Sequence, residues 1–388
     1  MKVVAMQQAA LRVGFFTECY RPIVNGVVAS VDALADGLRA RRHEVYCFAP
    51  NVPGYAERPG PVFRMPSLPL PLKTPYRLTL PLVSRRNLNG IIRRLSIIHA
   101  HSPFITGWMS VWYARRFGIP LVYTYHTQLE QYAHYVPFDA KAIRAFTSTL
   151  TRAYANAADA VVVPTAAMAD QLVELGVRSR IEVVPSGIDV STFASGKRRD
   201  DVRARLGAAQ GDVLALTVSR LGREKNLERI IDALAHDRRT NLRLAIVGEG
   251  PHRATLERYV KERRLAERVR FSGHMERAEL PDVYASADVF LFSSLSETQG
   301  IVLAEALAAG CRIVAVDTPQ TRDVLRDAAR YVPDDAGAMA AALRRVEGPA
   351  GAADQAKSKA AAAQFSRELQ AERTAKLYED LIGQSRRS

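Results

Sequence analysis

Short apolar runs recur along this chain, and most are followed by a polar loop and then by apolar positions at helical spacing. Continuous apolar runs of this length predict strands that are buried on both faces of a parallel sheet. Strands that alternate with helices predict an α/β fold. The runs lie at residues 11–17, 44–49, 97–102, 121–125, 160–163 and 181–185, and again at 213–219, 242–247, 269–274, 289–292 and 311–316.

The alternation of strands and helices restarts after residue 186, which predicts two doubly wound domains. We place the first domain at residues 1–186 and the second at residues 187–365. Residues 366–388 have the spacing of a helix whose apolar stripe lacks a core of its own. Residues 51–81 are rich in proline, which predicts an extended, irregular segment.

One strand, loop and helix in the second domain carry the clearest chemistry. Residues 289–292 predict a buried strand, residues 294–299 a loop, and Gly300 the start of a helix that Gly310 ends in a left-handed cap. A helix start of this kind presents backbone amides, here those of Gly300, Ile301 and Val302, at the positive end of the helix dipole. The segment therefore predicts an anion site.

Two carboxylates frame this anion site. Glu297 precedes the helix and Glu305 lies about a turn and a half inside it, so both cannot touch one phosphate. Each can accept hydrogen bonds from hydroxyl groups on one side of the phosphate, which is the shape of a nucleotide sugar. The alternative, on the two residues alone, is a pair of solvated surface acids.

Cations precede this stretch in the second domain. Arg220 and Lys225 straddle the loop after the strand at 213–219, where they can clamp a diphosphate; a solvated basic loop is the alternative. The strand at 242–247 ends in a tight turn that begins at Gly248. We expect this turn at the base end of the nucleotide.

The stretch from Glu297 to Glu305 resembles the Glu-x7-Glu motif of the retaining, GT-B-fold glycosyltransferases of family 4, and the resemblance extends from about Val13 to about Ile382. It implies two Rossmann-like domains that face each other across a cleft. It also implies that Glu297 contacts the donor sugar and that Glu305 holds the ribose hydroxyls. Many members carry an aromatic residue where this chain has Gln299, and Glu-Thr-Gln-Gly is similar to the branch that glucosylates diacylglycerol.

The resemblance implies further roles, residue by residue. His126, after the strand at 121–125, matches the histidine beside the reacting sugar; a structural polar residue is the alternative. Gly26 matches the glycine loop near the donor diphosphate, although an Asn-Gly pair alone is usually only a turn. His274 matches the residue near the base, and the matches at Arg220 and Lys225 imply diphosphate contacts. The terminal helix is expected to return to the first domain.

Composition adds a possible partner for the first domain. Residues 1–185 hold 21 Lys and Arg against 11 Asp and Glu, which accounts for +10 of the net charge of +14. This charge fits an anionic membrane, and no basic and aromatic repeat of a known nucleic-acid module accompanies it. The stripe Leu88, Ile91, Ile92 and Leu95, flanked by arginines, predicts a helix packed on its sheet or, alternatively, a membrane-facing helix.

The cysteines, the acidic motifs and the apolar runs bear on metal binding and on where in the cell the protein is found. Cys19, Cys47 and Cys311 fit neither a disulfide framework nor a metal site, and the Asp-x-Asp of metal-dependent transferases is absent. We therefore expect no metal and no cofactor, with the nucleotide sugar as a substrate. Neither a membrane-spanning run nor a signal peptide is evident, which predicts a cytoplasmic protein that is peripheral on the inner face of the cell membrane.

The sequence predicts a hexosyltransferase that moves glucose from UDP-glucose to a lipid hydroxyl such as that of diacylglycerol. Tyr132 and Tyr135 lie close enough to His126 in the chain to line the acceptor mouth. Two alternatives remain: a GDP-mannose-dependent mannosyltransferase and a nucleotide-sugar epimerase of the same fold.

Overall fold

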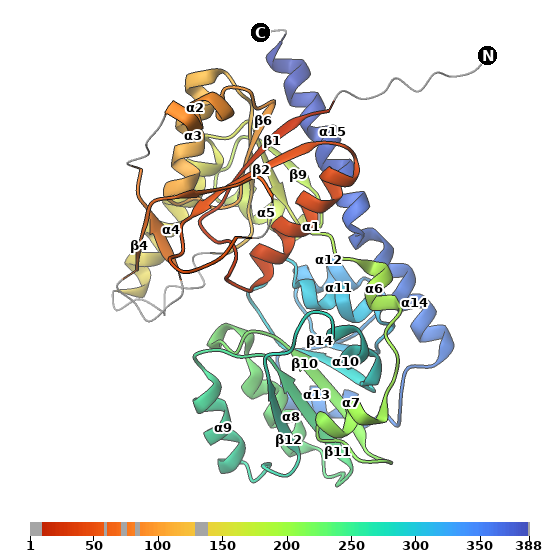
Figure 1. The fold of residues 1–388 in the computed structure, drawn as a ribbon. Coiled ribbons are helices and arrows are strands. Elements are labelled where there is room, and N and C mark those ends of the chain that lie inside the picture. Colours follow the sequence, from red (N-terminus) through yellow and green to blue (C-terminus); the bar gives the residue numbers. More distant parts are fainter. Residues whose placement is uncertain (1–9, 58–59, 71–75, 82–85, 129–138, 387–388) are drawn as a thin grey trace, which may run out of the picture. The chain divides into compact units, whose positions relative to one another are not determined.

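In the computed structural model the chain forms two units, each built on a parallel sheet (Figure 1). The first unit comprises Met1–Pro164, Met168–Gly187 and Arg367–Ser388, and the second comprises Thr165–Ala167 and Ile188–Ser366. The structure describes residues 10–57, 60–70, 76–81, 86–128 and 139–386. The boundary was predicted after residue 186, and the chain passes into the second unit after Gly187.

The sheet of the first unit has the strand order β3-β2-β1-β6-β7-β8-β9, and every neighbouring pair is parallel. Its central strands are wholly buried, as expected for continuous apolar runs. The order reverses between β1 and β6, which makes their carboxyl ends a switch point. The strands are β1 (Arg12–Phe16), β2 (Glu44–Pro50), β3 (Val62–Met65), β6 (Ile97–Ala100), β7 (Leu121–Thr124), β8 (Ala160–Val163) and β9 (Arg180–Val183).

Helices connect these strands and cover the sheet. The Asn25-Gly26 pair does not form a separate turn here, because α1 already begins at Gly26. The cause is Asn25, whose side chain accepts the amide of Val28 at 3.0 Å and so caps the helix. The helices are α1 (Gly26–Ala40), α2 (Arg86–Ile92), α3 (Ile105–Phe117), α4 (Ala140–Ala155), α5 (Ala166–Glu174) and α15 (Arg367–Ser385).

The terminal helix α15 belongs to the first unit and lies alongside α1, as Figure 1 shows. Gly37 of α1 permits the close approach, because a Cβ there would lie 2.8 Å from the Cβ of Ala371 and 2.8 Å from the carbonyl oxygen of Arg367. Tyr378 and Leu381 complete the same core as the apolar face of α1. The apolar stripe of α15 is therefore buried on the first unit.

The proline-rich segment is more regular than predicted in the part that the structure describes. Its residues 62–65 form β3, which pairs with β2 at the sheet edge, and β4 (Ser67–Pro69) and β5 (Arg77–Thr79) form an antiparallel hairpin. Glu18 fixes this hairpin to α3 by accepting the amides of Thr79 at 2.6 Å and Thr106 at 2.9 Å. The prolines are compatible with strands here because they lie at edges and ends.

The arginine-flanked stripe at α2 belongs to the core. Ile92 and Leu95 are buried, and Leu88 and Ile91 pack against the same cluster. The prediction of a helix packed on its sheet is confirmed. The alternative, a membrane-facing stripe, is wrong because these side chains pack against the core of the first unit.

The sheet of the second unit has the order β12-β11-β10-β13-β14-β15, again parallel throughout. Its switch point lies between β10 and β13. The strands are β10 (Val213–Val218), β11 (Leu242–Val247), β12 (Val269–Gly273), β13 (Val289–Phe292), β14 (Ile313–Val316) and β15 (Arg330–Val332). The helices are α6 (Val190–Ala194), α7 (Asp200–Arg205), η2 (Arg223–Lys225), α8 (Leu227–His236), α9 (Arg253–Glu262), α10 (Leu280–Ser286), α11 (Ile301–Ala308), α12 (Pro319–Leu325), α13 (Ala336–Leu343), α14 (Ala352–Ala362) and η3 (Ala363–Phe365).

Candidate functional site

The predicted donor residues of the second unit gather at its switch point. β10 and β13 are parallel neighbours, so the loops that follow them leave the same edge of the sheet. The hydroxyl of Ser293 donates to the carbonyl of Lys225 at 2.9 Å, and that of Ser294 donates to the carbonyl of Glu224 at 3.2 Å. The two loops are thus tied together where ligands of doubly wound sheets bind.

Lys225 and Glu297 meet directly between these loops. The Lys225 ammonium donates to Oε1 of Glu297 at 2.5 Å, and both side chains are mostly shielded, with 15% and 21% of their surfaces exposed. The interpretation of Glu297 as a solvated loop acid is therefore wrong. The carboxylate predicted for the sugar thus neutralises the cation predicted for the diphosphate.

Arg220 forms an ion pair with Glu224, a residue for which the sequence predicted no role. Its guanidinium donates to Oε1 of Glu224 at 3.1 Å, and the Glu224 carboxylate is only 2% exposed. The loop also needs glycine at position 222, because a Cβ there would lie within 2.5 Å of the Glu224 carboxylate. Glu224 therefore restrains Arg220, whose side chain remains 41% exposed.

The anion site predicted at the start of α11 has the expected backbone. Gly300 is the N-cap residue at φ +76°, a conformation that favours glycine, and no side chain caps the helix. At the other end, Gly310 at φ +75° donates to Leu307, and Cys311 donates to Ala306, which is a Schellman motif. The helix boundaries thus follow from the two glycines, and within the described part of the chain no side-chain hydrogen bond to the amides of Ile301 and Val302 is found.

Glu305 lies inside α11 but is buried, contrary to the alternative of a surface acid. Its Oε1 accepts from Arg277 at 3.1 Å and its Oε2 accepts from the hydroxyl of Tyr284 at 2.9 Å. Burial raises the pKa of Glu305, and these two donors oppose that shift. The carboxylate is thus held rigidly, and each oxygen has a second lone pair for a ligand hydroxyl.

The backbone of the turn that begins at Gly248 lies very close to the backbone of the loop after β10. Gly248 has φ +131°, and a Cβ there would lie 1.9 Å from the carbonyl oxygen of Ser219; a Cβ on Gly250 would lie 2.3 Å from that of Leu221. Because glycine has no side chain, the backbone after β11 can therefore approach the backbone after β10 this closely. His274 follows β12 directly and its side chain is about half exposed.

The predicted residues of the first unit lie at the carboxyl ends of its strands. His126 follows β7 and its Nε2 lies 3.0 Å from Nδ1 of His101, which follows β6. Gly26 is the first residue of α1, after β1. Tyr132 and Tyr135 lie outside the described residues.

Burial keeps three histidines of this unit neutral at pH 7. It lowers the pKa of His126 to about 4 and, with a contribution from nearby His126, that of His99 to about 3. Burial and the other two histidines hold the pKa of His101 well below its usual value. His126 is therefore a hydrogen-bonding group rather than a strong base.

The free energy of unfolding is expected to fall between pH 7 and pH 5. An unfolded histidine takes up a proton near pH 6.5, whereas the folded chain resists protonation until about pH 4 or below, so the unfolded state binds more protons in that window. The loss approaches about 1.4 kcal/mol per histidine for each pH unit below 6.5. Urea midpoints measured at both pH values test it; a constant midpoint would mean that the folded histidines are not held neutral.

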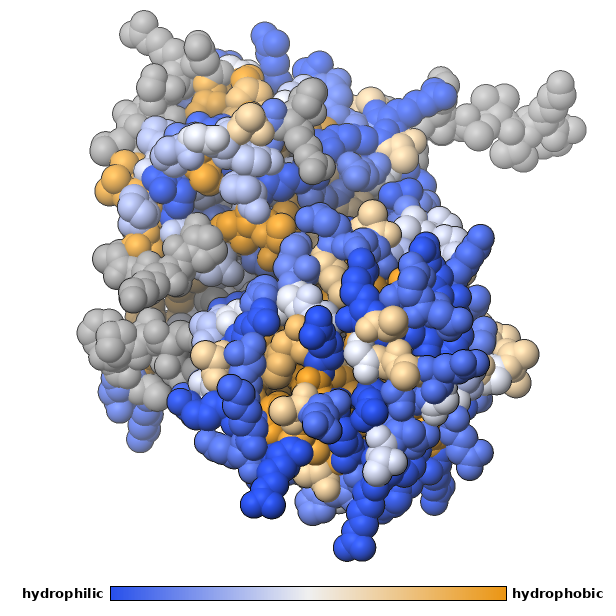
Figure 2. Space-filling view, turned by 60° about the horizontal axis from the view of Figure 1, so that its bottom comes forward, coloured by the Kyte–Doolittle hydropathy of each residue, from blue (hydrophilic) through white to orange (hydrophobic). Residues whose placement is uncertain are grey.

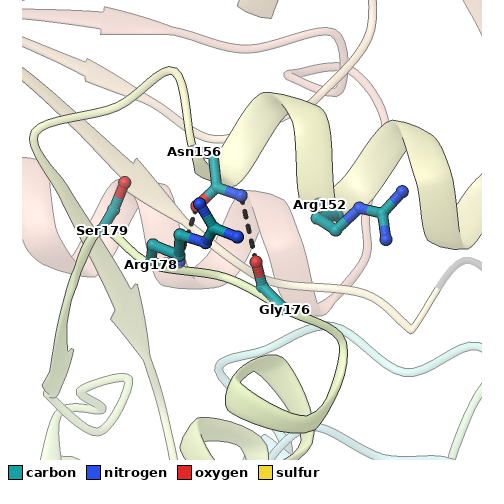
Figure 3. Close-up of a pocket in the computed structure, with 5 residues that line it drawn as sticks. All are labelled: Arg152, Asn156, Gly176, Arg178 and Ser179. Atoms are coloured by element: carbon teal, nitrogen blue, oxygen red, sulfur yellow. Dashed lines mark hydrogen bonds between the residues drawn. The ribbon is translucent and has the colours of Figure 1, made fainter.

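A surface hollow lies elsewhere on the first unit, away from the predicted site residues. Figure 3 shows it lined by Arg152, Asn156, Gly176, Arg178 and Ser179, with Asn156 bonded to the backbone of Gly176 and Arg178. These residues precede β8 and β9, at the opposite edge of the sheet from His126. None of the predicted site residues lines it.

The described residues include no group of three or more His, Cys, Asp or Glu that could hold a metal ion. No helix in the described part of the chain is long and apolar enough to cross a membrane. Cys19, Cys47 and Cys311 are free thiols, as expected.

Four supporting residues were not predicted from the sequence. Glu224 lies in the loop between Arg220 and Lys225, and His101 ends a predicted strand, but neither position by itself indicates a role. Arg277 and Tyr284 are separated from Glu305 by 28 and 21 positions, and no local pattern connects them. Of these four, His101 could have been noticed from the sequence, because His99 and His101 occur together at the end of a predicted strand.

Comparison with known families matches both halves of the chain. The family described as "Glycosyltransferase Family 4" matches residues 24–192, and that described as "Glycosyl transferases group 1" matches residues 198–363. An alpha-monoglucosyldiacylglycerol synthase of Acholeplasma laidlawii is 31% identical, over 78% of this chain and 80% of its own length. A GDP-mannose-dependent alpha-mannosyltransferase of Mycobacterium tuberculosis is 32% identical, over 81% of both chains.

Solved structures share the fold at lower identity. A sucrose-phosphate synthase from Thermosynechococcus elongatus superposes with a TM-score of 0.73 at 22% identity, covering 96% of this chain and 99% of that one. Anabaena HepE in complex with UDP gives a TM-score of 0.73 at 18% identity, covering 95% and 100%. These likenesses confirm the predicted fold class, GT-B, and are too distant to carry more.

Proposed function

This chain belongs to glycosyltransferase family 4, and from that membership we propose that it transfers glucose from UDP-glucose to a hydroxyl of diacylglycerol, with retention of configuration. It is a nucleotide-sugar-dependent hexosyltransferase. The donor, the stereochemistry and the lipid are the proposal. Its place of work would be the cytoplasmic face of the cell membrane, to which it binds peripherally.

The observation that carries the proposal is the cluster at the switch point of the second unit. There Lys225, Glu297 and the uncapped start of α11 lie on two loops that are hydrogen-bonded to each other. A cation and free amide donors suit a diphosphate, and a carboxylate beside them suits a sugar hydroxyl. The names of the two 29–31% identical relatives, both alpha-monoglucosyldiacylglycerol synthases, support glucose and diacylglycerol.

In the proposed site, different residues bind different parts of the nucleotide sugar. Arg220, Lys225 and the amides of residues 300–302 hold the diphosphate, and Glu305 holds the ribose. The base lies toward Gly248 and His274, and Glu297 contacts the sugar. The roles of His126 at the sugar and Gly26 at the diphosphate remain predictions from the family resemblance. Tyr132 and Tyr135 remain predicted acceptor residues.

The proposed chemistry follows from the charges. The bond from the sugar C1 to the diphosphate breaks as positive charge develops on the sugar ring, and the bond from C1 to the acceptor oxygen forms on the same face. The acceptor proton passes to the departing diphosphate, since no second carboxylate is placed as a nucleophile. Arg220, Lys225 and the dipole of α11 stabilise the leaving group.

Donor binding requires Lys225 to change partners at least in part. In the structure its ammonium pairs with Oε1 of Glu297 at 2.5 Å. A diphosphate offers several charged oxygens to the same ammonium, which can donate up to three hydrogen bonds. Phosphate contact then loosens the hold on Glu297, so this carboxylate becomes available to the sugar as the donor arrives.

A second candidate, transfer of mannose from GDP-mannose, is favoured by the 32% identical mannosyltransferase. The deciding experiment incubates the protein with UDP-glucose, UDP-galactose, GDP-mannose and ADP-glucose, each with diacylglycerol vesicles, and follows nucleotide release and glycolipid formation. Glucolipid from UDP-glucose alone supports the proposal. Mannolipid from GDP-mannose would replace it, and a changed sugar without any acceptor would indicate an epimerase.

Loss of the Lys225 or Glu305 charge is expected to weaken UDP binding by roughly ten- to a hundredfold. Each variant, Lys225→Ala or Glu305→Gln, removes one charged hydrogen bond worth about 1.5 to 3 kcal/mol. Calorimetry with UDP measures the change, and Lys261→Ala, an exposed lysine of α9, is the control for charge alone. Unchanged affinity in both variants would show that the donor binds elsewhere.

The melting temperature separates a binding role of Glu305 from a structural one. Because burial raises the pKa of Glu305, its ionised form is less favourable in the folded chain, and folding stability falls as pH rises through that pKa. Glu305→Gln removes this cost while keeping the side-chain size. We therefore expect weaker UDP binding at pH 7 without a lower melting temperature.

Activity is expected to survive removal of divalent ions. Arg220, Lys225 and the α11 amides supply positive charge to the diphosphate without a metal. Rates measured in excess EDTA should stay within about twofold of those with magnesium. Loss of most activity in EDTA, with recovery on adding magnesium or manganese, would contradict this expectation.

A further inference from the structure

A stack of histidines lies behind the residue predicted to meet the sugar. His99 and His101 come from the end of β6, and His126 follows β7, the adjacent parallel strand. The rings of His99 and His101 stack with centroids 4.3 Å apart, and those of His101 and His126 lie 5.2 Å apart. All three belong to the first unit.

Only one proton can occupy the contact between His101 and His126. Nδ1 of His101 and Nε2 of His126 lie 3.0 Å apart, so one nitrogen donates and the other accepts. Both rings are neutral at pH 7, and each neutral imidazole has one N–H and one bare nitrogen. The direction of this hydrogen bond therefore fixes the tautomer of both rings.

The surroundings of Nε2, the other ring nitrogen of His101, indicate which histidine donates the hydrogen bond. Its Nε2 is buried and has no hydrogen-bond partner among the residues that the structure describes. A proton on Nε2 would be a buried donor without an acceptor, and orphaned buried N–H groups are rarer than orphaned acceptors. The proton of His101 is therefore assigned to Nδ1, which donates to Nε2 of His126.

His101 cannot rotate freely out of this arrangement. Phe15 packs edge-on against both His99 and His101, with centroids 5.5 and 4.7 Å away. His99 is fixed in turn by the hydroxyl of Tyr378 at 2.5 Å on Nδ1 and by that of Thr124 at 2.6 Å on Nε2. The terminal helix α15, which carries Tyr378, thus helps to hold the stack.

We propose that His101 is a positioning residue that holds His126 as the neutral tautomer with its proton on Nδ1. His126 then carries its N–H at Nδ1, while its Nε2 accepts from His101 and takes no proton from the acceptor. The inference rests on the proposed function for the role of His126 at the sugar. The tautomer itself does not depend on that role.

The tautomer is tested first, on the wild-type protein without substrate. Long-range proton–nitrogen correlation spectra of 15N-labelled protein at pH 7 distinguish a protonated from a bare ring nitrogen, and His126→Asn identifies the signals of His126. We expect His126 with a protonated Nδ1 and a bare Nε2. A protonated Nε2 on His126 overturns the proposal, whatever reaction the protein catalyses.

Kinetics test the positioning role with matched variants. The amide nitrogen of asparagine can take the place of Nδ1, whereas that of glutamine reaches the place of Nε2. We expect His101→Leu and His101→Gln to lower kcat by roughly 10- to 100-fold, as when a reacting group is misplaced, with the KM for the nucleotide sugar within about threefold. His101→Asn should recover most of the loss.

A buried histidine outside the stack supplies the control. His43 is buried, its Nδ1 accepts the amide of Leu11 at 3.2 Å, and its Nε2 also has no partner among the described residues. His43→Leu should cost stability but leave kcat unchanged. Equal turnover of His101→Leu and wild type, or equal loss in the Asn and Gln variants, overturns the positioning role. If His101→Leu does not fold, the Asn and Gln pair still decides it.

Discussion

Glu297→Gln is expected to lower kcat by about 100- to 1,000-fold while leaving the affinity for UDP within about threefold. The carboxylate lies beside the predicted diphosphate cation, Lys225, where the transferred sugar would sit. Positive charge develops on that sugar in the transition state, and a preorganised charge in a shielded site is worth about 3 to 4 kcal/mol there. UDP lacks the sugar, so its binding does not report on this interaction.

The measurement separates the two effects. Steady-state rates with UDP-glucose and diacylglycerol give kcat, and calorimetry with UDP gives the affinity. Glu228→Gln is a matched control, since this acid pairs with His252 in the same unit and has no place in the proposed site. A normal kcat for Glu297→Gln would remove Glu297 from the reaction, while a large loss of UDP affinity would make it a determinant of loop structure.

The alternation of apolar runs predicted the two parallel sheets because strands buried on both faces need apolar residues at every position. β10 and β13 illustrate this, since each is wholly buried and was recognised from its residues alone. The ends of α11 were predicted for a similar local reason, because positive φ angles at Gly300 and Gly310 favour glycine.

Other features depend on distant residues and could not be predicted in this way. The start of α1 depends on whether Asn25 caps a helix or makes a turn, and its Asn-Gly pair suits both. The burial of Glu305 depends on Arg277 and Tyr284, which reach it from another helix and the segment before it. Pairing of Lys225 with Glu297 joins positions 72 residues apart. Local spacing carries no information about such contacts.

We propose that a different helix of the basic first unit, α3, docks on the membrane. The α2 stripe is core, but Phe104, Trp108 and Trp112 recur every fourth residue along α3 and are 43%, 41% and 53% exposed. Arg115 and Arg116 follow in its last turn, and Arg116 lies 5.7 Å over the Trp112 ring. The face drawn in Figure 2 is mainly hydrophilic, with its apolar residues in small groups.

Vesicles rich in anionic lipid are therefore expected to bind the protein roughly a hundredfold more tightly than neutral vesicles at low salt. An anionic surface attracts each nearby Lys or Arg by about 1 kcal/mol, so two or three arginines suffice, and the attraction weakens as salt screens it. The tryptophans would insert at the headgroup level, where their amphipathic rings are favoured. Co-sedimentation at rising anionic content and at two salt concentrations measures this.

Charge reversal of the α3 arginines supplies the specific test. Arg115→Glu together with Arg116→Glu should abolish most of the preference for anionic vesicles, because two attractions become repulsions. Arg253→Glu with Arg258→Glu, on α9 of the second unit, reverses the same charge elsewhere and should leave the preference intact. Glucose transfer to diacylglycerol should fall in parallel with vesicle binding. UDP affinity should stay unchanged, because the residues proposed to hold UDP, except Gly26, lie in the second unit. A protein that ignores vesicles yet glycosylates a soluble acceptor efficiently would refute the lipid acceptor and leave the hexosyltransferase assignment standing.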